Sequence, residues 1–313
     1  MSDNPSSVLP LRLGTRSSPL AIVQAEQVCA RLCTAHGWGE DAVELVPVVA
    51  SGDKVQDRPL ADVGGKALWT RELDAWLDEG RIDAAVHSLK DVETIRPEWI
   101  TLAAILPRAD RRDVLLGASS LRSIPQGATL GTSAPRRAAQ MKNLRPDIET
   151  VLFRGNVATR MAKLQAGEAD VTLLAAAGLE RLGQESVGTP LPLETWLPAP
   201  SQGAIGIECR TEDSVTRGHL DALNDAPTRR EVEAERALLE ALGGSCHSPV
   251  GVLVENADEG LHMRAALFSA DGAERVDGSS DLTPGDDEAI RAFAADLLAR
   301  ATPGITALFT GAS

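Results

Sequence analysis

The chain has 313 residues, of which 43% are hydrophobic and 24% are charged, and its 31 basic and 45 acidic residues give a net charge of −14. A chain of this length forms two or three domains with substantial cores. The acidic balance argues against nucleic acid and anionic membranes as partners, because proteins that bind them present basic surfaces. With 3% aromatic residues and no tyrosine, the composition also argues against an aromatic platform that stacks single-stranded bases.

The sequence contains no recognisable targeting or membrane-spanning segment. The start, MSDNPSSVLPLRLG, has neither the basic nor the apolar part of an export signal, and no stretch approaches the roughly 20 apolar residues of a membrane helix. The four cysteines (29, 33, 209 and 246) form no C-x-x-C pair and show no zinc-ligand spacing. We therefore expect a cytoplasmic protein without a disulfide scaffold and without a metal.

Short apolar runs alternate with amphipathic stretches over the first two-thirds of the chain, which predicts α/β domains with largely parallel sheets. Ser18 and Pro19 are typical of a helix start, as N-cap and first helical residue. The predicted strands are 9–14, 43–49, 84–86, 102–106, 114–116, 129–131, 150–153 and 171–174, and the predicted helices are 19–36, 67–79, 135–144 and 157–166.

The remaining third predicts a return crossing and a separate unit. Residues 197–210 contain Pro198, Pro200 and Gly203 before a predicted strand at 204–208, which indicates that the chain crosses back to the first lobe. The last unit has predicted helices at 228–242 and 287–301 and a hairpin-like pair at 250–254 and 262–268. We therefore predict a first lobe (1–106 and 203–224), a second lobe (107–202) and a C-terminal domain (225–313). The similar segments GTRSSP (14–19) and GTSAP (131–135) indicate that the two lobes share a fold.

Charge is distributed unevenly among these parts. Residues 107–201 hold 12 basic and 9 acidic residues, a net charge of +3, whereas residues 225–313 hold 7 and 16, a net charge of −9. Helix N-termini and guanidinium groups both bind anions, and the strand ends of a parallel sheet meet in one crevice. The arginines at predicted strand-to-helix junctions are Arg16, Arg136, Arg137, Arg154 and Arg160. They predict a cleft for a ligand with several negative charges, the alternative being surface arginines paired with local carboxylates.

Three further segments carry candidate residues. Residues 51–66 (SGDKVQDRPLADVGGK) predict either a mobile loop that brings Lys66 to the cleft or a solvated loop, and their glycine spacing excludes a Walker loop. Lys90 and Asp91 follow a predicted buried strand, where a carboxylate can stabilise a cation or transfer a proton. Cys246 in GGSCHSP suits a covalent anchor or nucleophile, or a small buried cysteine in a turn. A papain-like pair with the adjacent His247 is not expected.

Together these segments resemble the hydroxymethylbilane synthase (porphobilinogen deaminase) family. The matching segments, in the family's order, are GTRSSPLA (14–21), VGGKALW (63–69), DAAVHSLKDV (83–92), GTSAPRR (131–137), LFRGNVATR (152–160), AAAGLERLG (175–183), PAPSQGAIGIECR (198–210) and GGSCHSPVG (243–251). The resemblance implies an α/β fold of three domains: two periplasmic-binding-protein-like lobes around a cleft, and a smaller α+β C-terminal domain that carries the cofactor cysteine.

The resemblance implies an enzyme that joins four porphobilinogen units head to tail, releasing ammonia, on a dipyrromethane cofactor. Water then releases hydroxymethylbilane for tetrapyrrole biosynthesis. By the same resemblance, a thioether attaches the cofactor to Cys246, Asp91 is the catalytic carboxylate, and the protein is a monomer. The implied cofactor- and substrate-binding residues are Arg16, Ser18, Lys66, Trp69, Ser88, Lys90, Thr132, Ser133, Arg136, Arg137, Arg154, Gly155, Arg160 and Gln202. The acetate and propionate of each porphobilinogen match the predicted anion cleft.

A few positions depart from the family pattern, and two other classes of protein compete with the enzyme. Glu93 stands where the family usually has Pro, Ala134 and Pro135 where Ser-Leu is common, Ser201 where it has Gly, Ser245 where it has a second Gly, and Trp69 where it usually has Phe. The main rival is a non-catalytic anion-binding protein of two lobes, which would usually be exported and would have no use for Cys246 or Asp91. A cysteine-nucleophile hydrolase is a third class, and it lacks a convincing base.

Overall fold

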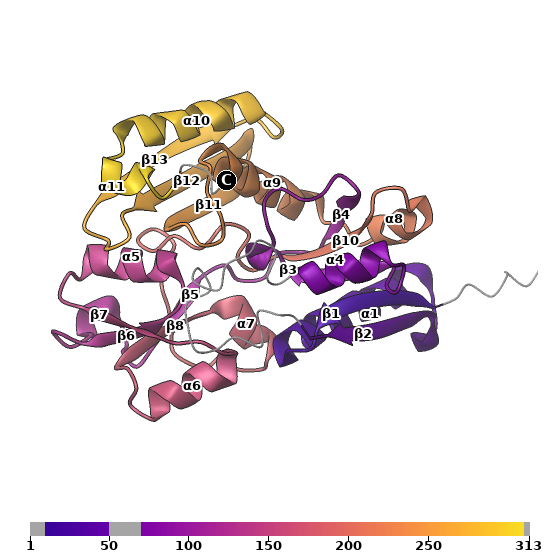
Figure 1. Cartoon of the computed structure of the whole chain (residues 1–313), viewed down its shortest axis with the longest axis horizontal. Helices are drawn as coiled ribbons and strands as arrows, with labels where there is room; N and C mark the ends of the chain where they lie inside the picture. Colours follow the sequence, from indigo (N-terminus) through magenta and orange to yellow (C-terminus); the bar gives the residue numbers. More distant parts are fainter. Residues whose placement is uncertain (1–9, 50–69, 310–313) are drawn as a thin grey trace, which may run out of the picture.

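The computed structural model describes residues 10–49 and 70–309. This part of the chain forms two α/β lobes and a C-terminal unit that packs against them (Figure 1). Each lobe is built on a five-stranded sheet, and the C-terminal unit on a three-stranded sheet. No helix in the described ranges is long and apolar enough to cross a membrane.

The first lobe is a sheet with helices on both faces. Its strands, in the order β2-β1-β3-β10-β4, are β2 (Val43–Val48), β1 (Leu11–Arg16), β3 (Ala84–Ser88), β10 (Ile205–Arg210) and β4 (Ile100–Ile105). The helices α1 (Pro19–His36) and α8 (Ser214–Asp221) contribute to the core on one face, and α4 (Arg71–Asp78) covers the other. Two short 3-10 turns, η1 (Glu40–Ala42) and η2 (Leu89–Asp91), precede β2 and follow β3.

The second lobe repeats this arrangement. Its strands, in the order β7-β6-β8-β5-β9, are β7 (Glu149–Leu152), β6 (Thr129–Thr132), β8 (Val171–Ala175), β5 (Asp113–Leu116) and β9 (Thr189–Pro190). One face packs against α5 (Pro135–Leu144), and the other against α6 (Val157–Gln165) and α7 (Ala176–Arg181). The turn η3 (Leu121–Ser123) joins β5 to β6.

The two glycine-threonine segments occupy equivalent places in the two lobes, which supports the predicted likeness. Gly14 pairs with Ala85 of β3, and Gly131 pairs with Thr172 of β8, in the same parallel relationship. A Cβ atom at either glycine would overlap a neighbouring side chain, that of Ile82 or of Phe153. At Gly131 a side chain would displace the Phe153 ring, whereas at Gly14 the overlap is with the end of the flexible Ile82 side chain.

The prediction of largely parallel sheets holds for four strands in each lobe and misses the fifth. In the first lobe β10 is antiparallel to both neighbours, and in the second β5 is antiparallel to both neighbours. The chain reaches β5 by crossing from β4, and it returns to β10 after β9. The two crossings lie side by side, because the Ala109 amide donates to the Gly203 carbonyl at 3.3 Å.

The C-terminal unit packs its sheet between its own helices and the second lobe. Its elements are α9 (Ala226–Ala241), β11 (Val250–Ala257), β12 (Gly260–Phe268), β13 (Arg275–Leu282), α10 (Asp287–Arg300) and α11 (Pro303–Thr306). The helices α9 and α10 bury one face of the antiparallel sheet. On the other face, Leu253 and Phe268 pack against Ala139 of α5 and against Leu197. Figure 1 shows this unit seated on α5.

Most predicted elements are present within a few residues, and the helices 19–36 and 135–144 have the predicted bounds. Ser18 caps α1 as predicted, accepting a hydrogen bond from the Ala21 amide. The helix α9 begins two residues before its predicted start, because Asp225 caps it by accepting from the Thr228 amide. The unpredicted elements are β9, β13, α7, α8 and α11. The strand β13 (RVDGSSDL) is mostly polar because it is an edge strand with one face towards solvent.

Candidate active site

Lys90 and Asp91 leave the first sheet together at the carboxyl end of β3. Between them and the strand, Leu89 is 1% exposed, and its amide donates to the carbonyl of Ala204. This buried leucine fixes the turn η2, so that the two charged side chains project beyond the sheet. Arg16 ends β1, which is the parallel neighbour of β3, and therefore lies at the same edge.

Arginines of the second lobe lie near Lys90 and Asp91 of this turn. We call Lys90, Arg136, Arg137, Arg154 and Arg160 the basic cluster. Burial lowers the pKa of Lys90 to about 8, and Arg136 and Arg137 add to the effect while Asp91 opposes it. Burial also lowers the pKa of Arg160 to about 10, with Arg137 and Arg154 again adding and Asp91 opposing. Asp91 of the first lobe and the arginines of the second therefore share one electrostatic site.

Two of the arginines are held by a carboxylate that sequence analysis missed. Asp113 is fully buried at the start of β5, and its Oδ1 and Oδ2 lie 2.7 Å from Arg137 Nη2 and 2.8 Å from Arg136 Nη2. Burial alone would raise the pKa of Asp113, but the two guanidinium groups outweigh it and hold that pKa far below its usual range. Trp196 Nε1 and Gln202 Nε2 also donate to this carboxylate, at 2.7 and 2.9 Å. Two cations share one anion here, so a positive charge remains.

The first turn of α5 leaves hydrogen-bond donors for an anion. Besides Asp113, Arg136 and Arg137 donate to the backbone carbonyls of Leu197 and Leu173. The Nε atoms of both arginines are buried and have no acceptor among residues 10–49 and 70–309. The helix α5 also begins without a side-chain cap at Ala134. Buried donors without acceptors are costly, so this donor set fits an anionic group that supplies the acceptors.

Gly155 and Ser133 hold the guanidinium group of Arg160 in place. Gly155 has a φ of 107°, a conformation that side chains rarely adopt, and a Cβ there would overlap Thr159. Arg160 Nε donates to the Gly155 carbonyl at 3.0 Å, and Arg160 Nη2 to Ser133 Oγ at 3.4 Å. The loop between β7 and α6 thus holds this guanidinium against the end of β6.

Cys246 lies in the loop that joins α9 to β11, and its side chain is exposed. The surrounding protein raises the pKa of its thiol through partial desolvation first, and then through Asp91 and Glu93. Burial lowers the pKa of the neighbouring His247; Arg154 adds to this effect, while Asp91 and Glu93 oppose it. The loop that carries Cys246 therefore lies near charged groups of both lobes, namely Asp91 and Glu93 of the first and Arg154 of the second.

Other predicted residues support the site through internal contacts. Ser88 Oγ is held by the buried side chain of Gln24, whose Nε2 lies 2.8 Å away. Thr132 Oγ1 accepts from the Ala134 amide at 3.1 Å, and Gln202 holds Asp113. Lys66, Trp69 and the predicted loop 51–66 lie outside the described residues.

A second buried carboxylate braces the first lobe. Glu208 on β10 is 1% exposed, and its Oε2 lies 2.9 Å from Arg96 Nη2 and 3.2 Å from His87 Nε2. Burial alone would raise the pKa of Glu208, but His87 and Arg96 outweigh it and lower the pKa to about 2. Arg96 also donates to Glu93, which stands where the family pattern usually has Pro. Asp113 and Glu208 thus lie on the antiparallel strands of their lobes, β5 and β10.

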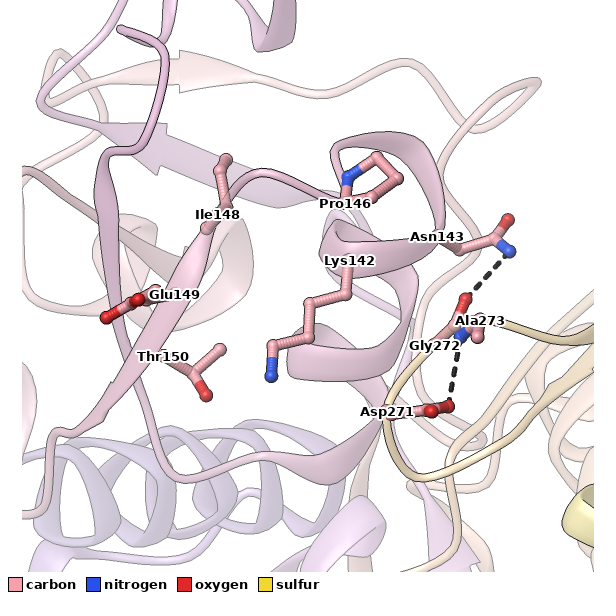
Figure 2. A pocket seen from close by; sticks show the side chains of 9 residues that line it. All are labelled: Lys142, Asn143, Pro146, Ile148, Glu149, Thr150, Asp271, Gly272 and Ala273. Atoms are coloured by element: carbon pink, nitrogen blue, oxygen red, sulfur yellow. Dashed lines mark hydrogen bonds between the residues drawn. The ribbon is translucent and has the colours of Figure 1, made fainter.

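The pocket in Figure 2 is not this site. It has a volume of about 730 Å³, and its lining comes from the end of α5, the start of β7 and the turn after β12. Asn143 Nδ2 donates to the Gly272 carbonyl across its edge at 2.9 Å. None of the predicted site residues lines it, and it marks the seam between the second lobe and the C-terminal unit.

Comparison with known families settles the relationship. The model described as "Porphobilinogen deaminase, dipyromethane cofactor binding domain" matches residues 11–218, and the model of the C-terminal domain of porphobilinogen deaminase matches residues 229–290. The chain belongs to the porphobilinogen deaminase family. It is 57% identical to the porphobilinogen deaminase of Sphingopyxis alaskensis over 96% of both chains. It is 44% identical to that of Paracoccus denitrificans over 88% of this chain and 89% of the other.

Among solved structures, the chain is similar to the VFT2 domain of BvgS from Bordetella pertussis. The identity is 14% and the TM-score 0.42, over 73% of this chain and 91% of the other. A periplasmic His/Glu/Gln/Arg/opine-family binding protein from Silicibacter pomeroyi is 18% identical, with a TM-score of 0.36, over 68% and 88% of the two chains.

The cofactor of the porphobilinogen deaminase family fits the residues of this site. A dipyrromethane made from two porphobilinogen units carries four carboxylates, which require several cationic donors. The unpartnered Nε atoms of Arg136 and Arg137, the uncapped start of α5 and the burial of the other cations meet that requirement. Cys246 offers a thiol that faces the same charges.

The sequence predicts the cations of the site and does not predict the buried polar residues that hold Arg136 and Arg137, Ser88, and Arg96. Asp113, Glu208 and Gln24 each lie within or beside a predicted strand or helix. A single polar residue in such a segment is the one feature of the sequence that could have indicated a buried polar contact. Asp113 directly precedes the run VLLG, and local sequence indicates no role for it because its partners lie 23 and 24 residues away in the chain.

Proposed function

We propose that this chain joins four porphobilinogen units head to tail, with loss of ammonia, on a dipyrromethane attached through a thioether to Cys246. Hydrolysis by water then releases hydroxymethylbilane for tetrapyrrole biosynthesis. The single observation that carries the proposal is the convergence of Asp91, Cys246 and the basic cluster, from three separate parts of the chain, in one electrostatic site. A non-catalytic anion-binding protein requires the cations and has no need of Asp91 or Cys246.

In this proposal Asp91 is the catalytic carboxylate. The dipyrromethane supplies the free pyrrole carbon at which chain growth starts. As ammonia leaves porphobilinogen, positive charge develops on the pyrrole, and the Asp91 carboxylate stabilises that charge and accepts hydrogen bonds from pyrrole N–H groups. Lys90 and Arg160 both lie near enough to Asp91 to be affected by its charge, so the carboxylate belongs to the same site as these cations.

The cations bind and orient the carboxylates of cofactor and substrate. Arg136 and Arg137 are fixed by Asp113, so they offer donors without losing side-chain entropy on binding. Arg154, Arg160 and Lys90 provide further positive charge where neighbouring groups restrict water. Arg16, Ser18, Lys66, Trp69, Ser88, Thr132, Ser133, Gly155 and Gln202 complete the proposed binding set.

The proposed division of labour follows the predicted domains. Residues 1–106 and 203–224 carry Asp91, residues 107–202 carry most of the arginines, and residues 225–313 carry Cys246. Arg108 in one crossing pairs with Glu235 of α9 at 2.8 Å, and the Ser201 amide in the other crossing donates to the same carboxylate at 2.6 Å. This contact ties the C-terminal unit to both crossings. We propose that the enzyme acts as a cytoplasmic monomer.

The experiment is an intact-mass measurement with an ammonia-release assay. Wild-type protein should carry an adduct of two porphobilinogen units less two ammonia, and Cys246→Ala should carry none. Cys209→Ala is the matched control, because Cys209 is buried in the core of the first lobe, and it should retain the adduct. A fully active protein of unmodified mass would overturn the covalent attachment. A protein that binds porphobilinogen and releases no ammonia would favour the anion-binding alternative.

A further inference from the structure

Two arginines of α9 hold the first lobe by its backbone. Arg236 Nη2 donates to the carbonyls of Glu93 and Thr94 at 2.6 and 3.1 Å, and its Nη1 donates to the Val92 carbonyl at 3.3 Å. Arg229, two turns earlier on the same face of the helix, donates through Nη2 to two carbonyls of β4 at 2.8 and 3.1 Å. Neither contact has a part in the function described above.

The backbone that Arg236 binds belongs to the catalytic turn. The three carbonyls are those of the residues that directly follow Asp91 in the chain. Val232, on the same face of α9, is fully buried in one apolar cluster with Leu89 and Val92, which stand on either side of the two charged residues of the turn. The helix therefore packs against this turn with an apolar side chain and holds its exit with a guanidinium group.

The same segment is also fixed from within the first lobe. The Glu93 carboxylate accepts from Thr70 Oγ1 at 2.9 Å and from Arg96 Nη1 at 3.2 Å. Arg96 is in turn held by the buried Glu208, through two bonds of 2.9 Å. Loss of Arg236 would thus release the carbonyl side of the segment and leave its other anchors in place. We expect such a change to loosen the turn without unfolding the lobe.

The helix that holds the turn also carries the attachment cysteine. Cys246 lies five residues beyond Ala241, the last residue of α9. The amides of Gly243 and Gly244 donate back to carbonyls of the last helical turn at 2.8 and 2.9 Å, which fixes the start of the loop on the helix. The charge of Asp91 acts on the Cys246 thiol, so the turn and the loop lie near each other. The helix α9 is therefore a rigid connection between them.

We propose that Arg236 is a positioning residue: by holding the backbone that follows Asp91, it fixes that carboxylate relative to the cofactor on Cys246. This role rests on the proposed function. Arg236 acts through the backbone, because carbonyls of the turn accept from its donors. A shift of about 1 Å in a catalytic group can cost about 100-fold in rate, so the contact should govern turnover rather than substrate affinity.

The test compares Arg236→Gln with Arg229→Gln, the same change at the matched arginine of α9. In Arg236→Gln the kcat for ammonia release should fall at least about tenfold, and the KM for porphobilinogen should stay unchanged because no substrate contact is removed. Arg229→Gln should keep the wild-type kcat. Intact mass should show the dipyrromethane adduct in all three proteins, and urea denaturation should show comparable losses of unfolding free energy in the two variants.

Amide hydrogen exchange gives a readout that does not depend on turnover. The Val92 amide donates to the Leu89 carbonyl at 3.2 Å and closes the catalytic turn. Its exchange should become faster in Arg236→Gln, because the segment that follows loses its anchor on α9. In Arg229→Gln the exchange of this amide should equal that of wild type.

Three outcomes would overturn the role of Arg236: a wild-type kcat in Arg236→Gln, an equal loss of kcat in Arg229→Gln, or a raised KM with an unchanged kcat, which would place Arg236 in substrate binding. If Arg236→Gln does not fold, Arg236→Lys, which keeps the charge and a single donor group, is compared with Arg229→Lys in the same way. Wild-type protein that gains no adduct and releases no ammonia would instead overturn the proposed function.

Discussion

Arg137 Nη2 lies 2.7 Å from Asp113 Oδ1, in a pair in which Arg137 is 5% exposed and Asp113 fully buried. The pair joins the first turn of α5 to the start of β5, the strand that the chain enters on crossing from the first lobe. Because Arg136 binds the other oxygen of the same carboxylate, one side chain orients two of the cations proposed to bind the cofactor.

Replacing Asp113 by Asn should destabilise the protein strongly. Two buried guanidinium groups would lose their counter-charge, a loss that costs about 3–5 kcal/mol of unfolding free energy for buried pairs. The measurement is urea denaturation. Asp296→Asn is the matched control, because Asp296 forms an exposed pair with Arg300 at 2.8 Å, and it should cost less than about 1 kcal/mol. Similar losses of unfolding free energy in the two variants would show that Asp113 stabilises the protein no more than a surface ion pair does.

Replacing Asp91 by Asn should abolish turnover while the fold survives. The amide keeps the shape of the side chain and removes the charge, so ammonia release should fall by about 100-fold or more. The unfolding midpoint should stay at the wild-type value. Asp78→Asn, the same change at an exposed position near the end of α4, should leave turnover unchanged. Near-wild-type ammonia release by the Asp91 variant would contradict its catalytic role.

The affinity for porphobilinogen should depend on the charge of Lys90. Burial lowers the pKa of this lysine to about 8, so the side chain is charged below that pH and loses its charge above it. The KM for porphobilinogen should therefore rise between pH 7 and pH 9. In Lys90→Arg the guanidinium stays charged over this range, and the KM should change less. Parallel pH profiles of KM in the two proteins would show that another group is responsible.

Replacing Ser201 by Gly should stabilise the protein. Ser201 has a φ of 62° and is the only residue other than glycine with a positive φ in the described ranges. That conformation costs a residue with a side chain about 1–2 kcal/mol. Glycine removes this cost, but it also makes the unfolded chain more flexible, which offsets part of the gain in stability. The unfolding free energy should rise by up to about 1 kcal/mol in urea denaturation. Ser201→Ala keeps the Cβ atom and should give no gain, which separates backbone strain from loss of the hydroxyl.

The departure of Ser201 from the family pattern illustrates what sequence reasoning can reach. The sequence showed that a usual glycine is missing, and the structure supplied the reason that it matters, a left-handed turn in the crossing. Likewise, the start of α1 could be predicted from Ser18 and Pro19 because capping depends on neighbouring residues. The strand β13 could not, because its strand character depends on pairing with β12 rather than on its own polar sequence.

By itself the sequence determined the alternation of strands and helices, the cations at the strand ends, and the candidate residues Asp91 and Cys246, because these depend on local pattern and on motifs. Only the tertiary structure decided that β5 and β10 run antiparallel, that Asp113 holds Arg136 and Arg137, and that Asp91, Arg160 and the loop of Cys246 share one electrostatic site. These relationships join residues far apart in the chain. They are set when the lobes and the C-terminal unit pack together, and the contacts of Asp113 also meet the need to neutralise buried charges.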